Sequence, residues 1–359
     1  GPGRSAMPEE AAPVHDNAPT NYLDRKEAEE LVRHVSPTMA DSVPPMPDKP
    51  MRSSRSWIGI AAIASVVLIV LGIGLASIGM FSTHTTTTTT TTKNQSTPNN
   101  QNTQQPTGDV HQLIARADRL ARENNHQGSI DAYTQALRLV GTDTNLRLLI
   151  LQGRAARYGV LSKYVEQIAD LSDVIRLDGS AANYSARGLA YWFATEYDRA
   201  IADQTRAIQL DPKNASYVFE RGRSNMWKKD YIAAIADYSD AIRLNPNSGY
   251  YYAQRGAAHR NRNDFSRALS DYDQAIKLSP NDLSYYRERS DVYVARADAT
   301  PSTRSSDLNR AKADMDFVIG RGNNLASDYE KRGLILERLG NRVEAIADFR
   351  AALARDANR

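Results

Sequence analysis

The sequence predicts an all-α protein in which paired antiparallel helices repeat along the chain after a single transmembrane helix. The first observation is a period: Gly188, Gly222 and Gly256 lie 34 residues apart, and a fixed interval of this size is typical of stacked helical units. The second is residues 57–81, 25 consecutive residues without a charge, which suffice to cross about 30 Å of hydrocarbon. Three further sets share the period of the glycines: Ala200, Ala234 and Ala268; Ala207, Ala241 and Ala275; Pro212, Pro246 and Pro280.

The composition excludes several classes of function. The 359 residues include 45 basic and 42 acidic side chains, which leave a net charge of +3. This balance argues against a nucleic-acid-binding protein, whose electrostatic footprint would be a surplus of Lys and Arg. The chain contains no cysteine, so disulfides, thiolate metal sites and cysteine nucleophiles are excluded.

The segment ahead of the apolar span is expected to contribute little to the fold. Residues 1–6 are interpreted as a cleavage and cloning remnant and are set aside. Residues 7–56 are rich in Pro and acidic side chains, so they are expected to form a mostly disordered cytoplasmic tail. Within this tail, residues 22–35 could form a short helix against a partner or the membrane, since isolated helices of this length are marginal in water.

The flanks of residues 57–81 predict how the chain crosses the membrane. Trp57 and Phe81 stand at the two ends, where aromatic side chains suit the membrane interface. Three basic residues precede the span with no acidic residue among them: Lys49, Arg52 and Arg55. Because positively charged flanks stay in the cytoplasm, the N-terminus is expected there and the repeats on the other side. Residues 82–108, rich in Thr, Asn and Gln, are expected to form a flexible linker between them.

Each repeat unit carries two helical apolar patterns. In residues 184–214 the sequence Asp-Pro-Lys-Asn follows the second pattern and ends the helix. Glycine at position eight and alanine at position twenty of a unit allow two antiparallel helices to approach closely. With these residues the units resemble tetratricopeptide repeats. The resemblance covers residues 109–359 and implies a right-handed α-solenoid of about seven repeats and fourteen helices.

Counting from the recurring glycines sets the boundaries of the units. The third to fifth units match the resembling family closely, whereas the first two are degenerate, with Ala117 and Ala155 in the glycine position. The sixth has Ser290 in that position, and its Ala311 falls nine residues late, which predicts a longer turn between its helices. The seven units are residues 110–147, 148–180, 181–214, 215–248, 249–282, 283–325 and 326–359.

A second regularity places an arginine at position seven and an aspartate at position twenty-three of five units. We interpret these residues as a structural ion pair between the two helices of each repeat, because a half-buried guanidinium group needs a carboxylate partner. The alternative is a basic ladder that binds a ligand. The pairs are Arg187 with Asp203, Arg221 with Asp237, Arg255 with Asp271, Arg289 with Asp314, and Arg332 with Asp348.

No motif in the sequence indicates catalysis. The six histidines are scattered over the segments, and the chain has no Walker loop, no Gly-x-Ser-x-Gly elbow and no acidic calcium loop. We therefore expect no enzymatic activity, no cofactor and no bound metal.

Function is expected to reside on the concave surface that such repeats use to bind a protein or peptide partner. In the resembling family, groove residues occupy positions two, five, nine and twelve of the first helix, and here they include the aromatic, Met and Arg side chains that dominate binding hot spots. Some members clamp the terminal carboxylate of chaperones with Lys and Asn; the fourth repeat has Phe219, Glu220 and Arg223 at those places, so a co-chaperone role is not expected. The groove candidates are Trp192, Phe219, Arg223, Met226, Tyr250, Arg260, Arg287, Asp291 and Glu330.

Two functions remain open from the sequence. The first is a membrane-anchored scaffold or adaptor with its repeats on the periplasmic side of a bacterial inner membrane. The alternative is a signal-anchored organelle receptor whose cytosol-facing repeats capture precursor proteins. The repeat domain alone is expected to be monomeric, because Phe349 and Leu353 of the last helix would support weak contact at most. Oligomers would form through the span, where Gly72 and Ala76 make a small-xxx-small pair.

Overall fold

The structure is a computed structural model, and it describes residues 106–322 and 325–356. The predictions for residues 1–6, 7–56, 57–81 and most of 82–108 lie outside the described residues. Within the part that the structure describes, no helix combines the length and the apolar character that crossing a membrane requires.

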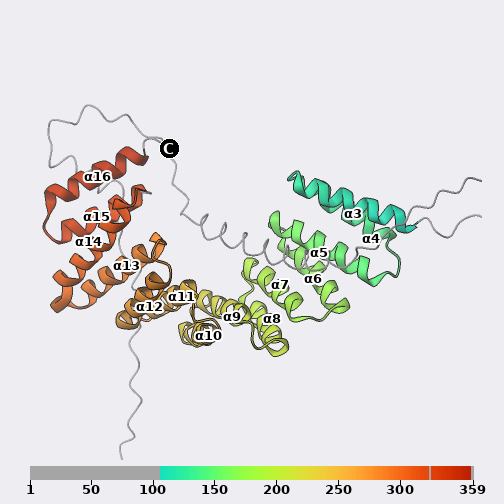
Figure 1. Ribbon diagram of the computed structural model, residues 1–359, viewed down its shortest axis with the longest axis horizontal. Coiled ribbons are helices and arrows are strands. Elements are labelled where there is room, and N and C mark those ends of the chain that lie inside the picture. The colour runs from blue at the N-terminus through green and yellow to red at the C-terminus, as the bar shows by residue number, and fades with distance from the viewer. Residues whose placement is uncertain (1–105, 323–324, 357–359) are drawn as a thin grey trace, which may run out of the picture. The chain divides into compact units, whose positions relative to one another are not determined.

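The predicted all-α helical repeat is confirmed: the described residues form fourteen α-helices and one short 3₁₀ helix, η2 (Pro301–Thr303). Successive helices pair in the order α3 with α4, α5 with α6, and so on to α15 with α16 (Figure 1). The helices are α3 (Pro106–Arg122), α4 (His126–Leu139), α5 (Thr144–Val160), α6 (Tyr164–Leu177), α7 (Ala181–Phe193), α8 (Tyr197–Leu210), α9 (Ala215–Trp227), α10 (Tyr231–Leu244), α11 (Gly249–Asn261), α12 (Phe265–Leu278), α13 (Leu283–Ala299), α14 (Arg304–Gly320), α15 (Ala326–Arg338) and α16 (Arg342–Asp356).

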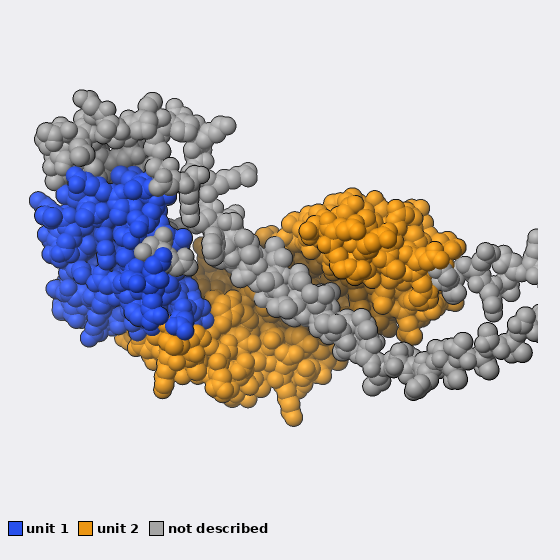
Figure 2. Space-filling model, turned by 45° about the horizontal axis from the view of Figure 1, so that its top comes forward, with its two compact units in different colours: residues 1–47, 281–359 blue, residues 48–280 orange. Residues whose placement is uncertain are grey.

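The described helices belong to two compact units, which Figure 2 shows in different colours. Helices α3 to α12 belong to the unit that ends at Pro280, and α13 to α16 belong to the unit that begins at Asn281. In the first unit the second helices α4, α6, α8 and α10 also pack against the first helix of the next repeat. The units are described separately below.

The helix starts agree with the counted units from the third repeat onward, but not before it. Helix α5 begins at Thr144, ahead of the boundary at residue 148, because the carboxylate of Asp143 accepts a hydrogen bond from the backbone N–H of Leu146 and caps the helix. Helix α3 begins at Pro106, inside the segment predicted to be a linker. The degenerate N-terminal repeats therefore start earlier than the glycine count indicates.

A left-handed backbone conformation recurs in the turn between the two helices of a repeat. Thr195 has φ 64°, and the equivalent Gly340 of the seventh repeat has φ 85°. In the sixth repeat the turn contains η2 instead, and α13 and α14 have 17 residues each. The other non-glycine residues with positive φ are Asn124, Ser162, Lys229 and Asn263.

In the fourth, fifth and seventh repeats an aromatic ring of the second helix covers the glycine of the first, whereas in the third repeat the Gln204 side chain covers Gly188. A Cβ added at Gly222 would lie 2.8 Å from Cε1 of Tyr238, so only glycine leaves room for that ring. At Gly333 the covering ring is Phe349, which is 2% exposed and therefore unable to contribute to an open apolar surface on α16. In the sixth repeat the buried Ser290 hydroxyl instead donates to the backbone oxygen of Ala311 at 3.2 Å.

Candidate partner-binding surface

The arginines at position seven pair with the aspartates at position twenty-three in all five predicted repeats. Arg187 is typical: its Nε and Nη2 donate to the two carboxylate oxygens of Asp203 at 2.8 and 2.9 Å. These hydrogen bonds raise the pKa of Arg187, and they outweigh the opposing effect of burial. The other pairs are Arg221 with Asp237, Arg255 with Asp271, Arg289 with Asp314, and Arg332 with Asp348. A sixth pair, Arg154 with Asp170, has the same separation of 16 residues but was not foreseen.

A third contact of these arginines extends to the preceding repeat. Arg187 Nη1 donates to the Ser172 hydroxyl at 3.1 Å, and Arg255 Nη1 donates to the Ser239 hydroxyl at 3.1 Å. Each such arginine therefore joins three helices, which assigns it to the packing between repeats and leaves it unsuited to hold a ligand. Sequence analysis missed the acceptor, although a Ser or Thr stands two residues after the aspartate in several repeats. The remaining contacts of this kind are Arg154 with Thr134, Arg221 with Thr205, and Arg332 with Asp316.

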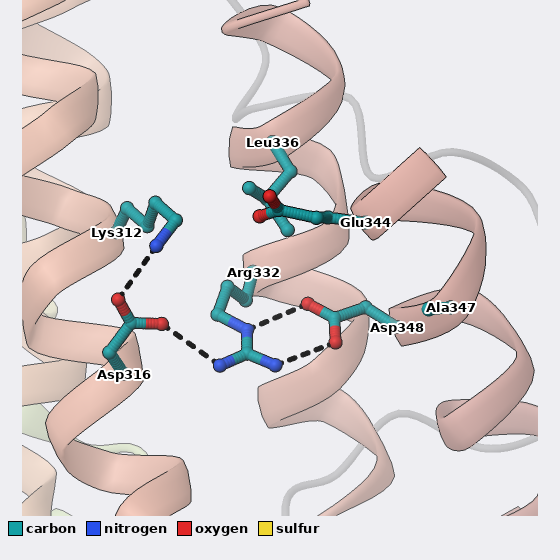
Figure 3. Close-up of a pocket in the computed structure, with 7 residues that line it drawn as sticks. All are labelled: Lys312, Asp316, Arg332, Leu336, Glu344, Ala347 and Asp348. Carbon is teal, nitrogen blue, oxygen red and sulfur yellow. Dashed lines mark hydrogen bonds and ion pairs between the residues drawn. The ribbon is translucent and has the colours of Figure 1, made fainter. Parts of the chain in front are cut away.

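A small pocket of about 200 Å³ lies beside one of these arginines, between α14, α15 and α16. Figure 3 shows Arg332 between the carboxylates of Asp348 and Asp316, with Lys312 also on Asp316 at 2.9 Å. The hydrogen bonds that Arg332 donates to Asp348 and Asp316 raise the pKa of Arg332. Two basic and three acidic side chains line this pocket, and both basic groups are paired with carboxylates, so we do not consider it a binding site.

Six groove candidates lie on the first helices of the third to fifth repeats, and four of them contribute to one surface. We call the surface formed by Trp192, Glu220, Arg223, Met226 and Tyr250 the α7–α11 face. The guanidinium carbon of Arg223 lies 4.2 Å from the centroid of the Trp192 ring, close enough for a cation–π contact. Tyr250 of α11 is 48% exposed, and Met226 is half-buried against the core.

The prediction for Phe219 is corrected by its burial. Its side chain is 4% exposed, and its ring stacks on Tyr251 at a centroid distance of 4.6 Å and packs on Tyr238 at 5.3 Å. A partner cannot reach this ring without opening the core between α9, α10 and α11. Phe219 is therefore a core residue at a position that the resembling family uses for its groove.

Two other candidates are engaged in ion pairs between α13 and α15. Arg287 donates through Nε and Nη2 to the buried carboxylate of Asp328 at 2.6 and 2.8 Å. Asp291 pairs with Lys331 at 2.7 Å. These contacts hold the sixth and seventh repeats together and leave little free charge for a partner. The last two candidates, Arg260 on α11 and Glu330 on α15, are half-buried.

Sequence analysis missed two features of the α7–α11 face. Glu220 accepts two hydrogen bonds from Arg223 Nη1, at 2.7 and 3.0 Å, and burial raises its pKa. The face also continues into a row of rings at the ends of the helices, in which Trp192 contacts Trp227 at a centroid distance of 5.9 Å. The row, in order, is Tyr164, Phe193, Trp192, Trp227 and Tyr197. In the sequence, this row is indicated by the recurrence of a tyrosine, Tyr164 and Tyr197, at the start of a second helix.

Metal binding finds no support in the described ranges, 106–322 and 325–356, which contain no group of three or more His, Cys, Asp or Glu side chains suited to an ion. The surface consists of rings, one buried ion pair and exposed hydroxyls. Such an arrangement can bind a segment of another chain.

Comparisons with known proteins agree with this architecture. A family model described as "Tetratricopeptide repeat" matches residues 185–249, and a second with the same description matches residues 249–282. Protein unc-45 homolog B from Xenopus laevis is 28% identical over 124 residues, which are 34% of this chain and 13% of that protein. This chain therefore matches a small part of that relative.

Solved structures are similar over more of the chain. A tetratricopeptide repeat protein from Parabacteroides merdae superposes with a TM-score of 0.54 at 17% identity, over 69% of this chain and 93% of that one. The C-terminal part of a repeat-containing protein from Cytophaga hutchinsonii gives 0.54 at 19% identity, over 68% and 96%. At such identities the likeness extends to the fold alone. The family models match residues 185–282, and the helix pairs from α7 to α12 and the likeness of fold agree with these matches. This chain therefore contains tetratricopeptide repeats.

Proposed function

We propose that the protein is a scaffold that binds a segment of a partner protein on the α7–α11 face, and that it acts by binding and not by catalysis. The observation that carries this proposal is the combination of exposed Tyr250 and Trp227 with the Arg223–Trp192 contact on neighbouring repeats. Trp, Tyr and Arg are the residues most enriched among binding hot spots. Tyr250 and Trp227 are 48% and 49% exposed, and Trp227 contacts Trp192, so part of this aromatic row faces solvent.

The proposal includes a location. Residues 57–81 would anchor the chain in a membrane, with the basic residues ahead of them in the cytoplasm and the repeats on the periplasmic side of a bacterial inner membrane. The uncharged span and the basic flank support this location. A signal-anchored receptor with cytosol-facing repeats is the second candidate, and it is favoured by the same order of anchor and repeats.

Site-specific photocrosslinking in the native cell tests the binding surface. A photoreactive phenylalanine analogue at position 250 on α11 is expected to form a defined adduct with one partner protein. The same analogue at Ile232, which is 68% exposed on the second helix α10, is the control and is expected to give none. Equal adducts at both positions would contradict the proposal, as would an adduct at position 250 that Trp227→Ala and Arg223→Gln leave unchanged.

Protease accessibility tests the location. With the outer membrane opened and the inner membrane intact, the repeats are expected to be cleaved while a tag on residue 7 is protected. Cleavage of the tag and protection of the repeats would reverse the proposed topology. Complete release of the chain by high salt would contradict the anchor itself.

A further inference from the structure

The α7–α11 face contains several hydrogen-bond donors that have no acceptor. The indole nitrogen Nε1 of Trp192 is buried without a partner, and so is the hydroxyl of Tyr238, a residue with 0% exposure. Arg223 uses Nη1 for both bonds to Glu220, and among the described residues its Nε and Nη2 have no hydrogen-bond acceptor. Buried polar groups without partners are rare in native proteins, because each costs the free energy of its lost hydration.

These donors lie close to one another. The guanidinium of Arg223 stacks on the Trp192 ring at 4.2 Å, and the positive charge of Arg223 and the negative charge of Glu220 act in opposite directions on the pKa of the Tyr238 hydroxyl. The side chains of Arg223 and Glu220 are 12% and 17% exposed, so this ion pair is shielded from water but still reachable. Among the described residues, the Trp192 indole and the remaining Arg223 nitrogens therefore lack an acceptor, and the Arg223–Glu220 pair is the part of the site that a partner can reach.

We propose that Arg223 uses Nε and Nη2 to anchor the side-chain carboxylate of an acidic residue in the partner segment, and that Glu220 takes up a proton when the segment binds. The proposal rests on the proposed function of the α7–α11 face. A carboxylate supplies two oxygens in the plane of the guanidinium fork, which a single carbonyl group does not.

The proton follows from charge balance at one guanidinium group. With the partner's carboxylate bound, Arg223 would have two carboxylates and one positive charge in a shielded site, which favours protonation of one carboxylate. Burial already raises the pKa of Glu220, and Arg223 alone opposes that effect. Once Arg223 turns to the partner, the opposing effect weakens, so Glu220 is the group that takes the proton.

Among the described residues, Arg223 is the charged group that acts on the pKa of Glu220. Helix α10 contributes Tyr238, and α11 contributes Tyr250 and Tyr251; burial raises the pKa of all three hydroxyls above the ordinary value of 10.0. Helix α7 contributes the Trp192 indole, which does not titrate. The nearest carboxylates of α8 and α10, Asp203 and Asp237, are held by their arginine partners.

The probe is an array of 15-residue peptides of random sequence, each made in a version with glutamate and a version with glutamine at the same place. Full-length protein is applied at pH 6.5. The glutamate versions are expected to be retained more strongly, and Arg223→Gln is expected to remove the difference. Arg243→Gln is the matched control, because Arg243 is an exposed arginine of α10 paired with Asp240, and it should leave the difference unchanged.

The proton is tested with the most strongly retained glutamate peptide. Its affinity for the unmodified protein is expected to rise as pH falls from 7.5 to 5.5, by up to about tenfold per pH unit for one proton taken up. Glu220→Gln mimics the protonated form, so it is expected to bind the peptide more tightly at pH 7.5 and without dependence on pH. This gain of affinity separates the proposal from a simple loss of folding in the Arg223 variant.

Each remaining outcome counts against a defined part of the proposal. Equal retention of both versions, lost on Tyr250→Ala, would show that the face binds segments but that the carboxylate anchor is wrong. Glutamate preference without pH dependence, or with pH dependence that survives Glu220→Gln, would overturn the proton uptake. Retention of no peptide would overturn both the anchor and the proposed function.

Discussion

The same two repeat positions have opposite roles in the two compact units. At positions five and nine, the fourth repeat has Phe219 in the core and Arg223 on the α7–α11 face. The sixth repeat has Arg287 and Asp291, and both form ion pairs with α15. A position in a repeat therefore does not define a binding residue by itself. The residue across from it in the next repeat decides whether it is free for a partner.

The opposing residues explain the difference. Asp328 and Lys331, at positions three and six of the seventh repeat, provide charges of the required sign for Arg287 and Asp291. At the same positions the fifth repeat has Tyr251 and Gln254, which carry no charge. Arg223 consequently pairs with Glu220 of its own helix, and part of its guanidinium group remains available.

The largest effect on stability is expected when the ion pair between α13 and α15 is broken. Asp328 is 2% exposed, and Asp328→Ala would leave the Arg287 guanidinium without its carboxylate partner. We expect the free energy of unfolding of this unit to fall by about 3–5 kcal/mol. Hydrogen exchange of α13 and α15 measures it. The control is Asp240→Ala in the exposed pair with Arg243, with an expected loss of less than about 1 kcal/mol. Equal losses would mean that Arg287 is solvated and that the comparison is wrong.

The next largest effect on stability is expected at the contacts between the two helices of a repeat, which differ between the fourth and sixth repeats. Gly222→Ala would place a Cβ 2.8 Å from the Tyr238 ring and 3.0 Å from Cβ of Asp237, so the helices must separate. We expect a loss of about 1–3 kcal/mol in thermal unfolding, more than the helix propensity of alanine restores. Ser290→Ala loses one hydrogen bond and should cost about 1 kcal/mol. A Gly222 variant as stable as the parent would show that the ring can move aside.

A smaller effect is pH dependence at position eleven, which is His259 in the fifth repeat and buried Leu336 in the seventh. Burial lowers the pKa of His259 below 6.5, although Asp271 and Asp264 oppose this and Arg255 and Arg267 add to it. The unfolded chain therefore binds the proton more readily. The contribution of neutral His259 to the free energy of unfolding should be fully present above pH 6.5. As the pH decreases below 6.5, the free energy of unfolding should fall by up to about 1.4 kcal/mol per pH unit.

Urea unfolding at pH 7.5 and pH 5.0 measures this dependence. His259→Leu is the matched variant, because leucine is the natural residue at this position of the seventh repeat. It should reduce the difference between the two pH values. An unchanged difference would assign the acid sensitivity to other groups.

The smallest expected effect concerns the turns. Thr195 is β-branched and has φ 64°, whereas the equivalent Gly340 has φ 85°. Thr195→Gly removes the strain of the left-handed conformation but adds freedom to the unfolded chain, so we expect a gain of about 0.5–1 kcal/mol. Gly340→Thr should cost about 1–2 kcal/mol. Differential scanning calorimetry of both variants measures these changes. A Thr195→Gly protein with a lower melting temperature than the parent would contradict the assignment of strain to Thr195.

The sequence predicted the helix pairs best where three repeat features coincide. Gly188, Ala200 and Pro212 together place α7 and α8, and the same holds for the next two repeats. The start of α5 was placed too late because it depends on a capping aspartate, Asp143, that is not part of the period. Counting also aligned the arginines with their aspartates, since both belong to one repeat.

The candidate site was less accessible to sequence reasoning. Whether Phe219 is buried depends on Tyr251 in the next repeat, and whether Arg287 is free depends on Asp328, 41 residues away. Neither follows from the period, because the period describes one unit and the site is made by neighbours. Charge matching between successive repeats would have found the second case.

The arginine at position seven has a consequence for how such a chain can grow by duplication. Each of the second to fourth repeats carries both halves of its junction: an arginine that donates backward, and an aspartate followed two residues later by a hydroxyl group. A copied unit would thus fit next to its parent without new contacts having to evolve. In α16 the residue two after Asp348 is Arg350, a donor in place of the acceptor. A further unit of the same kind would set two guanidinium groups against each other there, so tandem copying is compatible with the middle of the array and incompatible with α16.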